Sequence, residues 1–108
     1  MTPRLANTDE AGALARLIDN AYQPYRDRGV ALPDVSGGVA DFIAAGEVWV
    51  MGAAPPLGVL MLRLTMPDAH LMNVAVAPKG QGQGIGGALI RHAVRLAQDA
   101  GCTGIALA

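Results

Sequence analysis

The sequence predicts an α/β domain in which helices pack on a mixed β-sheet. Three features of the pattern indicate this. Apolar residues first recur every three or four positions, then form three short runs with brief connections, and then return to helical spacing before a last apolar run. The predicted order of elements is therefore β-α-α-β-β-β-α-β. Since 108 residues suit one domain, we expect residues 1–108 to form a single domain.

The N-terminal part is expected to contain a short strand at residues 4–6 and a long helix. Asn7 and Glu10 have the spacing of a capping box, which marks a helix start. The helix is expected to end near Pro24, because proline interrupts helical hydrogen bonding. Its apolar residues are alternately three positions and one position apart, which places them on one helix face. They are Leu14, Leu17, Ile18, Ala21, Tyr22 and Tyr25.

The middle of the chain is expected to form the antiparallel part of the sheet. A loop over residues 26–34 and a short helix over 35–45 lead into it. Apolar runs at 48–51, 57–64 and 69–76 predict three strands. Their connections are too short for crossover helices, so the strands should form an antiparallel meander.

Helical spacing returns after Gly84 and predicts a helix that ends near Gly101, a plausible C-cap. Its buried face should comprise Ile85, Leu89, Ala93, Leu96 and Ala97. His92 is expected on the solvated side of this helix. A last strand over residues 104–108 should lie parallel to strand 69–76, because a crossover helix joins the two.

Composition and charge exclude several classes of protein. The net charge is −1 and only 16% of residues are charged. No basic stripe for nucleic acid appears, so nucleic acid is not expected as a partner. No apolar stretch approaches the roughly 20 residues of a membrane span. Cys102 is the only cysteine, which excludes an internal disulfide and favours the reducing cytoplasm. We expect no bound metal.

The strongest chemical signal is residues 74–89, which run from strand through a glycine-rich loop into a helix. A helix N-terminus attracts phosphate, and glycines let the backbone curl around the anion. A Walker loop is excluded, because no Gly-Lys-Ser/Thr follows. The dinucleotide fingerprint matches at Gly82, Gly84 and Gly87, but its strand lies within a meander instead of opening a βαβ unit.

A third phosphate-loop pattern, Gln/Arg-x-x-Gly-x-Gly/Ala, matches at Gln81, Gly84 and Gly86. This segment resembles motif A of the GCN5-related N-acetyltransferases, the GNAT family. The Val-Ala-Val-x-Pro strand end and the Gly-Ile-Gly-Gly-Ala-Leu helix start share the resemblance. It extends to the two N-terminal helices and the meander, and so covers nearly the whole chain. The family fold and acetyl-CoA as cosubstrate are implied.

The resemblance also implies the residues that hold acetyl-CoA. The pyrophosphate would lie on the loop and the first helical turn: Gln81, Gly82, Gln83, Gly84, Ile85, Gly86 and Gly87. The strand end Val74, Ala75 and Val76 is assigned to the cofactor too. There the backbone groups of Val74 and Val76 would bind the pantetheine arm and the acetyl carbonyl.

Chemistry in the GNAT family is usually direct attack of an amine on the thioester. His70 lies four residues before Val74, where several family members carry a Glu or His base, so it is our candidate base. Its alternative is a solvent-facing histidine near a turn. Tyr22 and Tyr25 lie where the family often walls the acceptor site, although both also fit the apolar face of the helix.

The resemblance predicts an N-acetyltransferase that acts on a small-molecule or peptide amine. The family normally continues with another helix and two strands, so the resemblance implies a domain truncated before them. The alternative function is a non-catalytic acyl-CoA-binding or assembly module. A chain that stops on an apolar strand leaves an open sheet edge. We therefore expect either a homodimer or a further C-terminal segment.

Overall fold

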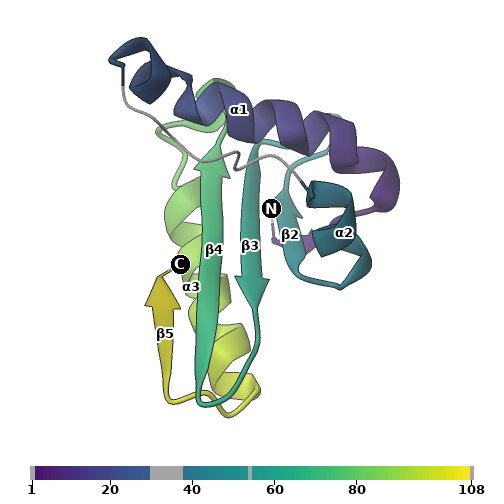
Figure 1. The fold of residues 1–108 in the computed structure, drawn as a ribbon, viewed down its shortest axis with the longest axis vertical. Coiled ribbons are helices and arrows are strands. Elements are labelled where there is room, and N and C mark those ends of the chain that lie inside the picture. Colours follow the sequence, from purple (N-terminus) through teal and green to yellow (C-terminus); the bar gives the residue numbers. More distant parts are fainter. Residues whose placement is uncertain (1, 30–37, 54, 108) are drawn as a thin grey trace.

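The computed structural model describes residues 2–29, 38–53 and 55–107. They form one five-stranded mixed sheet in the order β1-β2-β3-β4-β5 (Figure 1). Neighbouring strands are antiparallel except β4 and β5, which are parallel. This confirms the predicted fold class and the antiparallel meander. The strands are β1 Arg4–Leu5, β2 Val48–Met51, β3 Gly58–Arg63, β4 Asp68–Val76 and β5 Gly104–Leu107.

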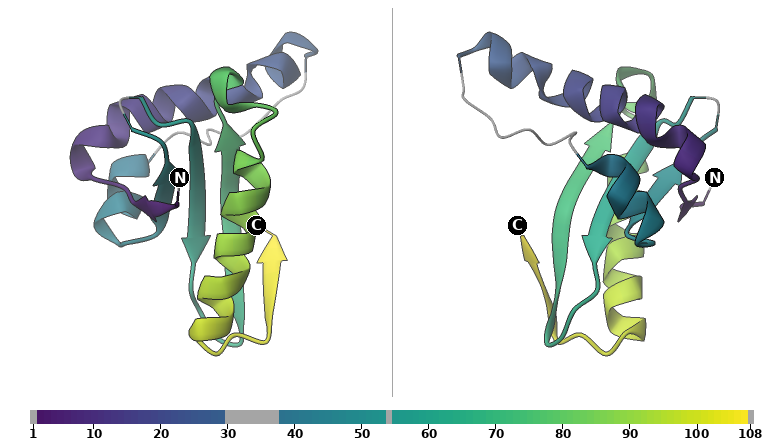
Figure 2. Two further views of the ribbon diagram at one scale, coloured as in Figure 1. Left: turned by 180° about the vertical axis from the view of Figure 1, so that it is seen from behind. Right: turned by 45° about the vertical axis from the view of Figure 1, so that its right-hand side comes forward.

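The helices lie on both faces of the sheet. Helices α1 (Ala11–Asp27) and α2 (Val39–Ala44) lie on one face, where α1 crosses the end at which β4 finishes. Helix α3 (Ile85–Asp99) runs along the strands on the opposite face (Figure 2). Two 3-10 turns, η1 (Thr8–Glu10) and η2 (Pro78–Gly80), precede α1 and α3.

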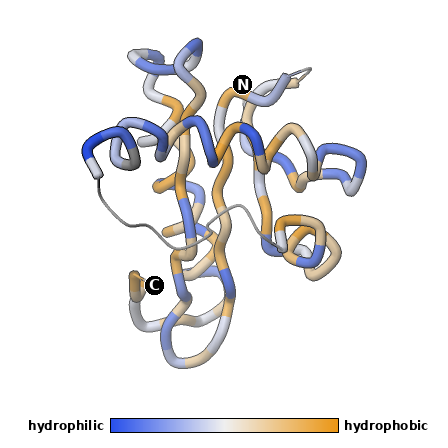
Figure 3. Tube along the Cα trace, turned by 45° about the horizontal axis from the view of Figure 1, so that its top comes forward, coloured by the Kyte–Doolittle hydropathy of each residue, from blue (hydrophilic) through white to orange (hydrophobic). Residues whose placement is uncertain are grey.

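Each face of the sheet has its own apolar core, because side chains alternate between faces along a strand. In β3, Val59 and Met61 pack toward α1, whereas Leu60 and Leu62 pack toward α3. Figure 3 shows the hydrophobic stretches of the trace along the strands and hydrophilic ones on turns and outer helix surfaces. These two cores fix both helix layers against the sheet.

Helix α1 does not end near Pro24 as predicted, but continues to Asp27 with the proline inside it. Proline removes one backbone hydrogen bond, and the last turn gains a bond from Gln23 Nε2 to Asp27 Oδ1 (2.8 Å). The predicted loop over 26–34 therefore begins later, and residues 30–37 lie outside the described part. Helix α2 begins at Val39, and residues 35–37 of the predicted helix lie outside the described residues.

Helix α3 confirms its predicted apolar face and its C-cap. Gly101 has a φ of 83°, and Cys102 N–H donates to the Ala97 carbonyl (2.9 Å), as in a Schellman motif. The prediction for His92 is wrong. Its imidazole packs edge-on to Trp49, and its Nε2 is buried without a hydrogen-bond partner among the described residues. Burial and the nearby Arg95 lower the pKa of His92.

Strand β4 contains an irregularity that the sequence pattern did not predict. Its pairing with β3 shifts between Met61, which faces Asn73, and Leu62, which faces Leu71. The extra residue in β4 is Met72. Such a bulge re-aims the side chains beside it and is common near functional sites.

Candidate functional site

The glycine-rich loop connects the end of β4 to the start of α3. After η2, the chain turns through Gln81, Gly82 and Gln83, which are all exposed. Gly82 and Gly84 have φ values of 80° and 75°. Side chains rarely tolerate that backbone conformation, which explains glycine at both positions. Gln83 Nε2 donates to the Lys79 carbonyl (2.8 Å), so this side chain bridges the loop.

The N-terminus of α3 is left uncapped. Its N-cap residue is Gly84, which has no side chain, and the first helical turn contains no acidic residue. The first intrahelical bond runs from Ala88 N–H to the Gly84 carbonyl (3.0 Å). The N–H groups of Ile85, Gly86 and Gly87 therefore have no partner within the helix. Together with the positive end of the helix dipole, they form an arrangement suited to a phosphate group.

Two further glycines hold this helix start in place, a packing role that the sequence pattern predicted for neither. A Cβ on Gly58 would lie 2.6 Å from Ile85 Cγ2, and one on Gly80 would lie 2.9 Å from Ile85 Cδ1. Ile85 is buried between them. Only residues without a side chain permit this approach. The one sequence signal for this close approach was the position of Gly58 inside an otherwise apolar strand.

Val74 and Val76 present backbone groups to an open side of β4. Ala77 N–H donates to the Leu57 carbonyl of the neighbouring segment (2.8 Å). Because bonding direction alternates along an antiparallel strand, Ala75 also bonds toward β3, whereas Val74 and Val76 face the other way. On that side, the described residues of β5 pair only with residues 68–71 of β4.

Ala75 differs from its neighbours. Its side chain is buried in the core beneath α1, and it pairs with Val59 of β3. Its side chain therefore faces α1 and its backbone bonds face β3, away from the open side of β4 to which Val74 and Val76 present their backbone groups.

His70 lies near the start of β4 and is exposed. It pairs with Arg63 of β3 and Ala106 of β5. Since Ala69 and Leu71 pack toward α3, the His70 side chain faces the side of the sheet that carries α1. Val74 is four residues away, or roughly 13 Å along an extended strand. Direct contact is excluded at this separation, and a proton path between the two would need a chain of several waters.

Tyr22 and Tyr25 are near each other but differ in surroundings. Their ring centroids are 6.2 Å apart. Tyr22 packs against the core, and its hydroxyl donates to Asn73 Oδ1 (3.3 Å). Tyr25 is 48% exposed, so the apolar face of α1 does not bury it. The structure therefore brings Tyr22 next to the bulge in β4.

Residues 2–29, 38–53 and 55–107 hold no group of three or more His, Cys, Asp or Glu side chains that could bind a metal ion. Among the helices in these ranges, none is both long enough and apolar enough to cross a membrane.

Comparison with solved structures relates this arrangement to known proteins. Rv2747 from Mycobacterium tuberculosis, determined in complex with CoA and NLQ, matches 99% of this chain with a TM-score of 0.76 at 20% identity. A GNAT family acetyltransferase from Brucella melitensis, determined in complex with acetyl-CoA, matches 97% with a TM-score of 0.74 at 25% identity. The alignment spans 63% of the Mycobacterium chain and 73% of the Brucella chain.

Comparison of the amino-acid sequence with known proteins gives fewer matches than comparison of the structure. No curated protein matches the chain significantly. The model of the acetyltransferase (GNAT) family matches residues 36–108, from the segment before α2 to the C-terminal strand. That range contains the meander, the glycine-rich loop and α3. The chain belongs to the GNAT family of acetyltransferases.

Proposed function

We propose that this chain binds acetyl-CoA and transfers its acetyl group to a primary amine. The observation that carries the proposal is the uncapped N-terminus of α3, reached through a loop with two glycines at positive φ. The pyrophosphate would accept hydrogen bonds from the N–H groups of residues 82–87, with Gln81 and Gln83 flanking it. The Brucella relative, whose structure holds acetyl-CoA, supports this assignment.

The open backbone edge of β4 would hold the rest of the cosubstrate. Val74 and Val76 offer N–H and C=O groups on that edge, which suit the amide-bearing pantetheine arm. An N–H donor at the acetyl oxygen would stabilise the charge that develops there during attack. The amine nitrogen attacks the thioester carbon, a tetrahedral intermediate forms, and the C–S bond breaks. The products are an amide and CoA, whose thiolate takes up a proton.

His70 is our candidate for the group that removes a proton from the ammonium. Its exposed position gives it access to solvent, and a chain of several waters would relay the proton over the roughly 13 Å to Val74. His70→Ala should lower the acetylation rate and flatten its rise with pH near neutrality, with acetyl-CoA affinity unchanged. His70→Gln, which keeps a hydrogen-bonding side chain, is the matched control for water positioning. An unchanged pH–rate profile in both variants would assign His70 to the surface.

Turnover tests the proposed activity itself. Acetyl-CoA is incubated with a panel of amines, amino acids and short peptides, and free CoA thiol is measured. Amine-dependent thiol release is the expected result. Calorimetric binding of acetyl-CoA without release for any amine would instead favour a non-catalytic acyl-CoA-binding module. Absence of binding would contradict both functions.

We also infer a homodimer formed through the edge of β5. Among the described residues, β5 is bonded to a strand on one side only, and its Leu107 is 80% exposed. Such an edge recruits a second strand unless charge blunts it. Light scattering should report a dimer for the chain and a monomer for Leu107→Lys. A monomeric unmodified chain would contradict the inference.

A further inference from the structure

Asn73 is the one buried polar residue in the described part of the chain, with 7% of its surface exposed. A buried amide without a hydrogen bond is costly, so its surroundings must satisfy it. Its Oδ1 accepts a hydrogen bond from the Tyr22 hydroxyl at 3.3 Å. Asn73 also adjoins Met72, the extra residue of the β4 bulge. A strand position in a core would ordinarily hold an apolar side chain.

The bond from Tyr22 leaves the other end of the amide unused. An asparagine side chain carries two N–H donors on Nδ2 besides its carbonyl oxygen. Nδ2 has no hydrogen-bond partner among the described residues. The only fully buried side-chain atom found without a partner there is His92 Nε2. Nδ2 of Asn73 is not such an atom, so it keeps a small exposed area.

The unused donor lies beside the proposed acetyl site. Asn73 directly precedes Val74, and consecutive Cα atoms are about 3.8 Å apart. The Val74 backbone faces the open edge of β4, whereas the Asn73 side chain lies on the α1 side with Tyr22. His70 faces the same side. An acceptor that approaches the thioester from this side would pass the Asn73 amide.

We propose that Asn73, oriented by Tyr22, donates a hydrogen bond to an oxygen atom of the acceptor. The preferred acceptor is then an amine with a carbonyl or carboxylate oxygen near its nitrogen, as in an amino acid or its amide. A plain alkylamine offers no acceptor atom to Nδ2. A site built to hydrogen-bond a polar group discriminates strongly against analogues that lack it. The inference rests on the proposed acetyl transfer and names its substrate class.

Two amines of equal size test the inference. Glycinamide carries a carbonyl oxygen next to its aminomethyl group, and isobutylamine has methyl groups in that place. Asn73→Ala should reduce kcat/KM for glycinamide about tenfold more than for isobutylamine, the effect of one lost hydrogen bond. Comparing the change for each amine cancels their different basicity. The KM for acetyl-CoA should stay the same.

Two further variants separate recognition from folding. Asn73→Asp keeps the shape but replaces the donor by an acceptor, so it should show the same selective loss. Tyr22→Phe should show a smaller loss in the same direction, because the amide loses its orienting partner. Melting temperatures identify any variant that fails to fold. Equal losses for both amines, or none for either, would overturn the proposal.

A binding measurement keeps the test independent of turnover. In NMR spectra of the CoA-bound chain, the Asn73 side-chain amide signals should shift on addition of glycinamide and stay in place with isobutylamine. Equal responses to the two amines, or no response to glycinamide, would contradict the role of Asn73. Failure of the proposed function would appear separately, as the absence of CoA binding in calorimetry.

Discussion

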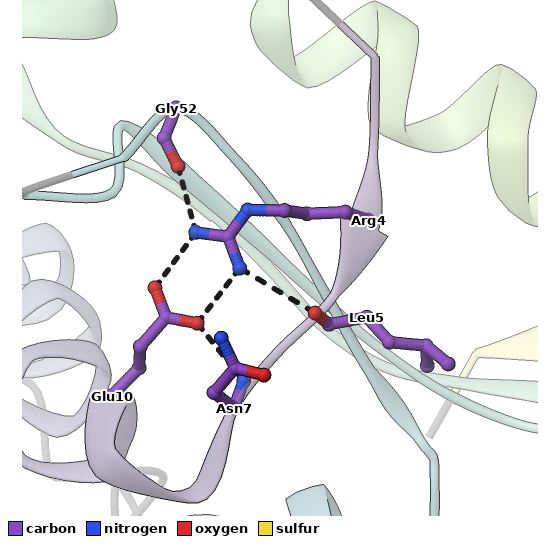
Figure 4. A network of polar contacts seen from close by, with 5 residues as sticks. All are labelled: Arg4, Leu5, Asn7, Glu10 and Gly52. Carbon is purple, nitrogen blue, oxygen red and sulfur yellow. Dashed lines mark hydrogen bonds and ion pairs between the residues drawn. The ribbon is translucent and has the colours of Figure 1, made fainter.

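The two long helices of this protein begin in opposite ways. Before α1, the Glu10 carboxylate accepts hydrogen bonds from Asn7 N–H (2.9 Å) and from both terminal nitrogens of Arg4 (2.9 and 2.8 Å). Arg4 also donates to the Gly52 carbonyl (3.2 Å), which ties this corner to the β2–β3 turn (Figure 4). These bonds hold the pKa of Glu10 at about 2. The protein's own carboxylate thus occupies the first helix start.

The start of α3 has glycine where the first helix start has charged and polar side chains. Neither a capping side chain nor a first-turn carboxylate serves its N–H groups. Unpaired donors at a helix start are satisfied by side chains, by water or by ligands. We therefore propose that the first end contributes to stability, whereas the second is kept open for an external anion.

The largest expected effect is on CoA affinity and comes from placing a side chain at the uncapped N-terminus of α3. Gly84→Val and Gly86→Val place a side chain at the phosphate position and displace its hydrogen bonds. Loss of two charge-assisted bonds of about 1.5 kcal/mol each corresponds to a reduction in CoA affinity of about 100-fold. Isothermal calorimetry with CoA measures the change.

The chain supplies a matched control for each of these variants. Gly46 has a φ of 73°, and a Cβ added there would meet no atom within 4 Å, as at Gly84 with its φ of 75°. Gly12 is the second residue of α1, as Gly86 is of α3, and an added Cβ would meet its nearest neighbour at 3.6 Å in both. Gly46→Val and Gly12→Val should therefore carry similar strain but keep CoA affinity. Equal affinity in all four variants would remove the glycine loop from the site.

A smaller effect follows from giving α3 the carboxylate that it lacks. Gly87→Asp should stabilise the helix start by about 0.3–1 kcal/mol through the helix dipole. Arg91, whose Nη1 would lie 3.2 Å from an added Cβ, can pair with it. The same charge should repel pyrophosphate and lower CoA affinity about tenfold relative to Gly87→Asn. The melting temperature should thus rise while the calorimetric affinity for CoA falls. A change of both in the same direction would contradict the comparison.

Removing the carboxylate from the first helix start should have the smallest effect. Glu10→Gln should cost on the order of 1 kcal/mol of unfolding free energy, because Arg4 is partly exposed and solvent screens the pair. The folded-state pKa of Glu10 is lowered from 4.5 to about 2. Its contribution is therefore present above about pH 4.5 and is lost as pH falls toward 2. In denaturant titrations, the difference in unfolding free energy between wild type and variant should decrease as pH falls over that range. CoA affinity at neutral pH should be unaffected.

The parts of the fold that the sequence predicted depend on local patterns. The meander, the buried face of α3 and the cap at Gly101 each follow from spacing or from a residue with one dominant conformational role. The glycine-rich loop was recognisable for the same reason.

The features that the sequence did not predict depend on packing between distant segments. Helix α1 passes through Pro24, and His92 is covered by Trp49 of β2. The close approach of Gly58 to Ile85 joins residues far apart in the chain. The bulge at Met72 was not predictable, because an extra residue does not change the apolar character of the run.

An NMR titration with CoA tests the contrast between the two helix starts most directly. The backbone amide signals of Gly82, Gly84 and the first turn of α3 should shift as CoA is added. Those of Asn7, Glu10 and Ala11 should stay in place, because Asn7 N–H already donates to the Glu10 carboxylate and the other two donate to backbone carbonyls. Shifts confined to the first helix start, or no shift across residues 82–87, would contradict the account.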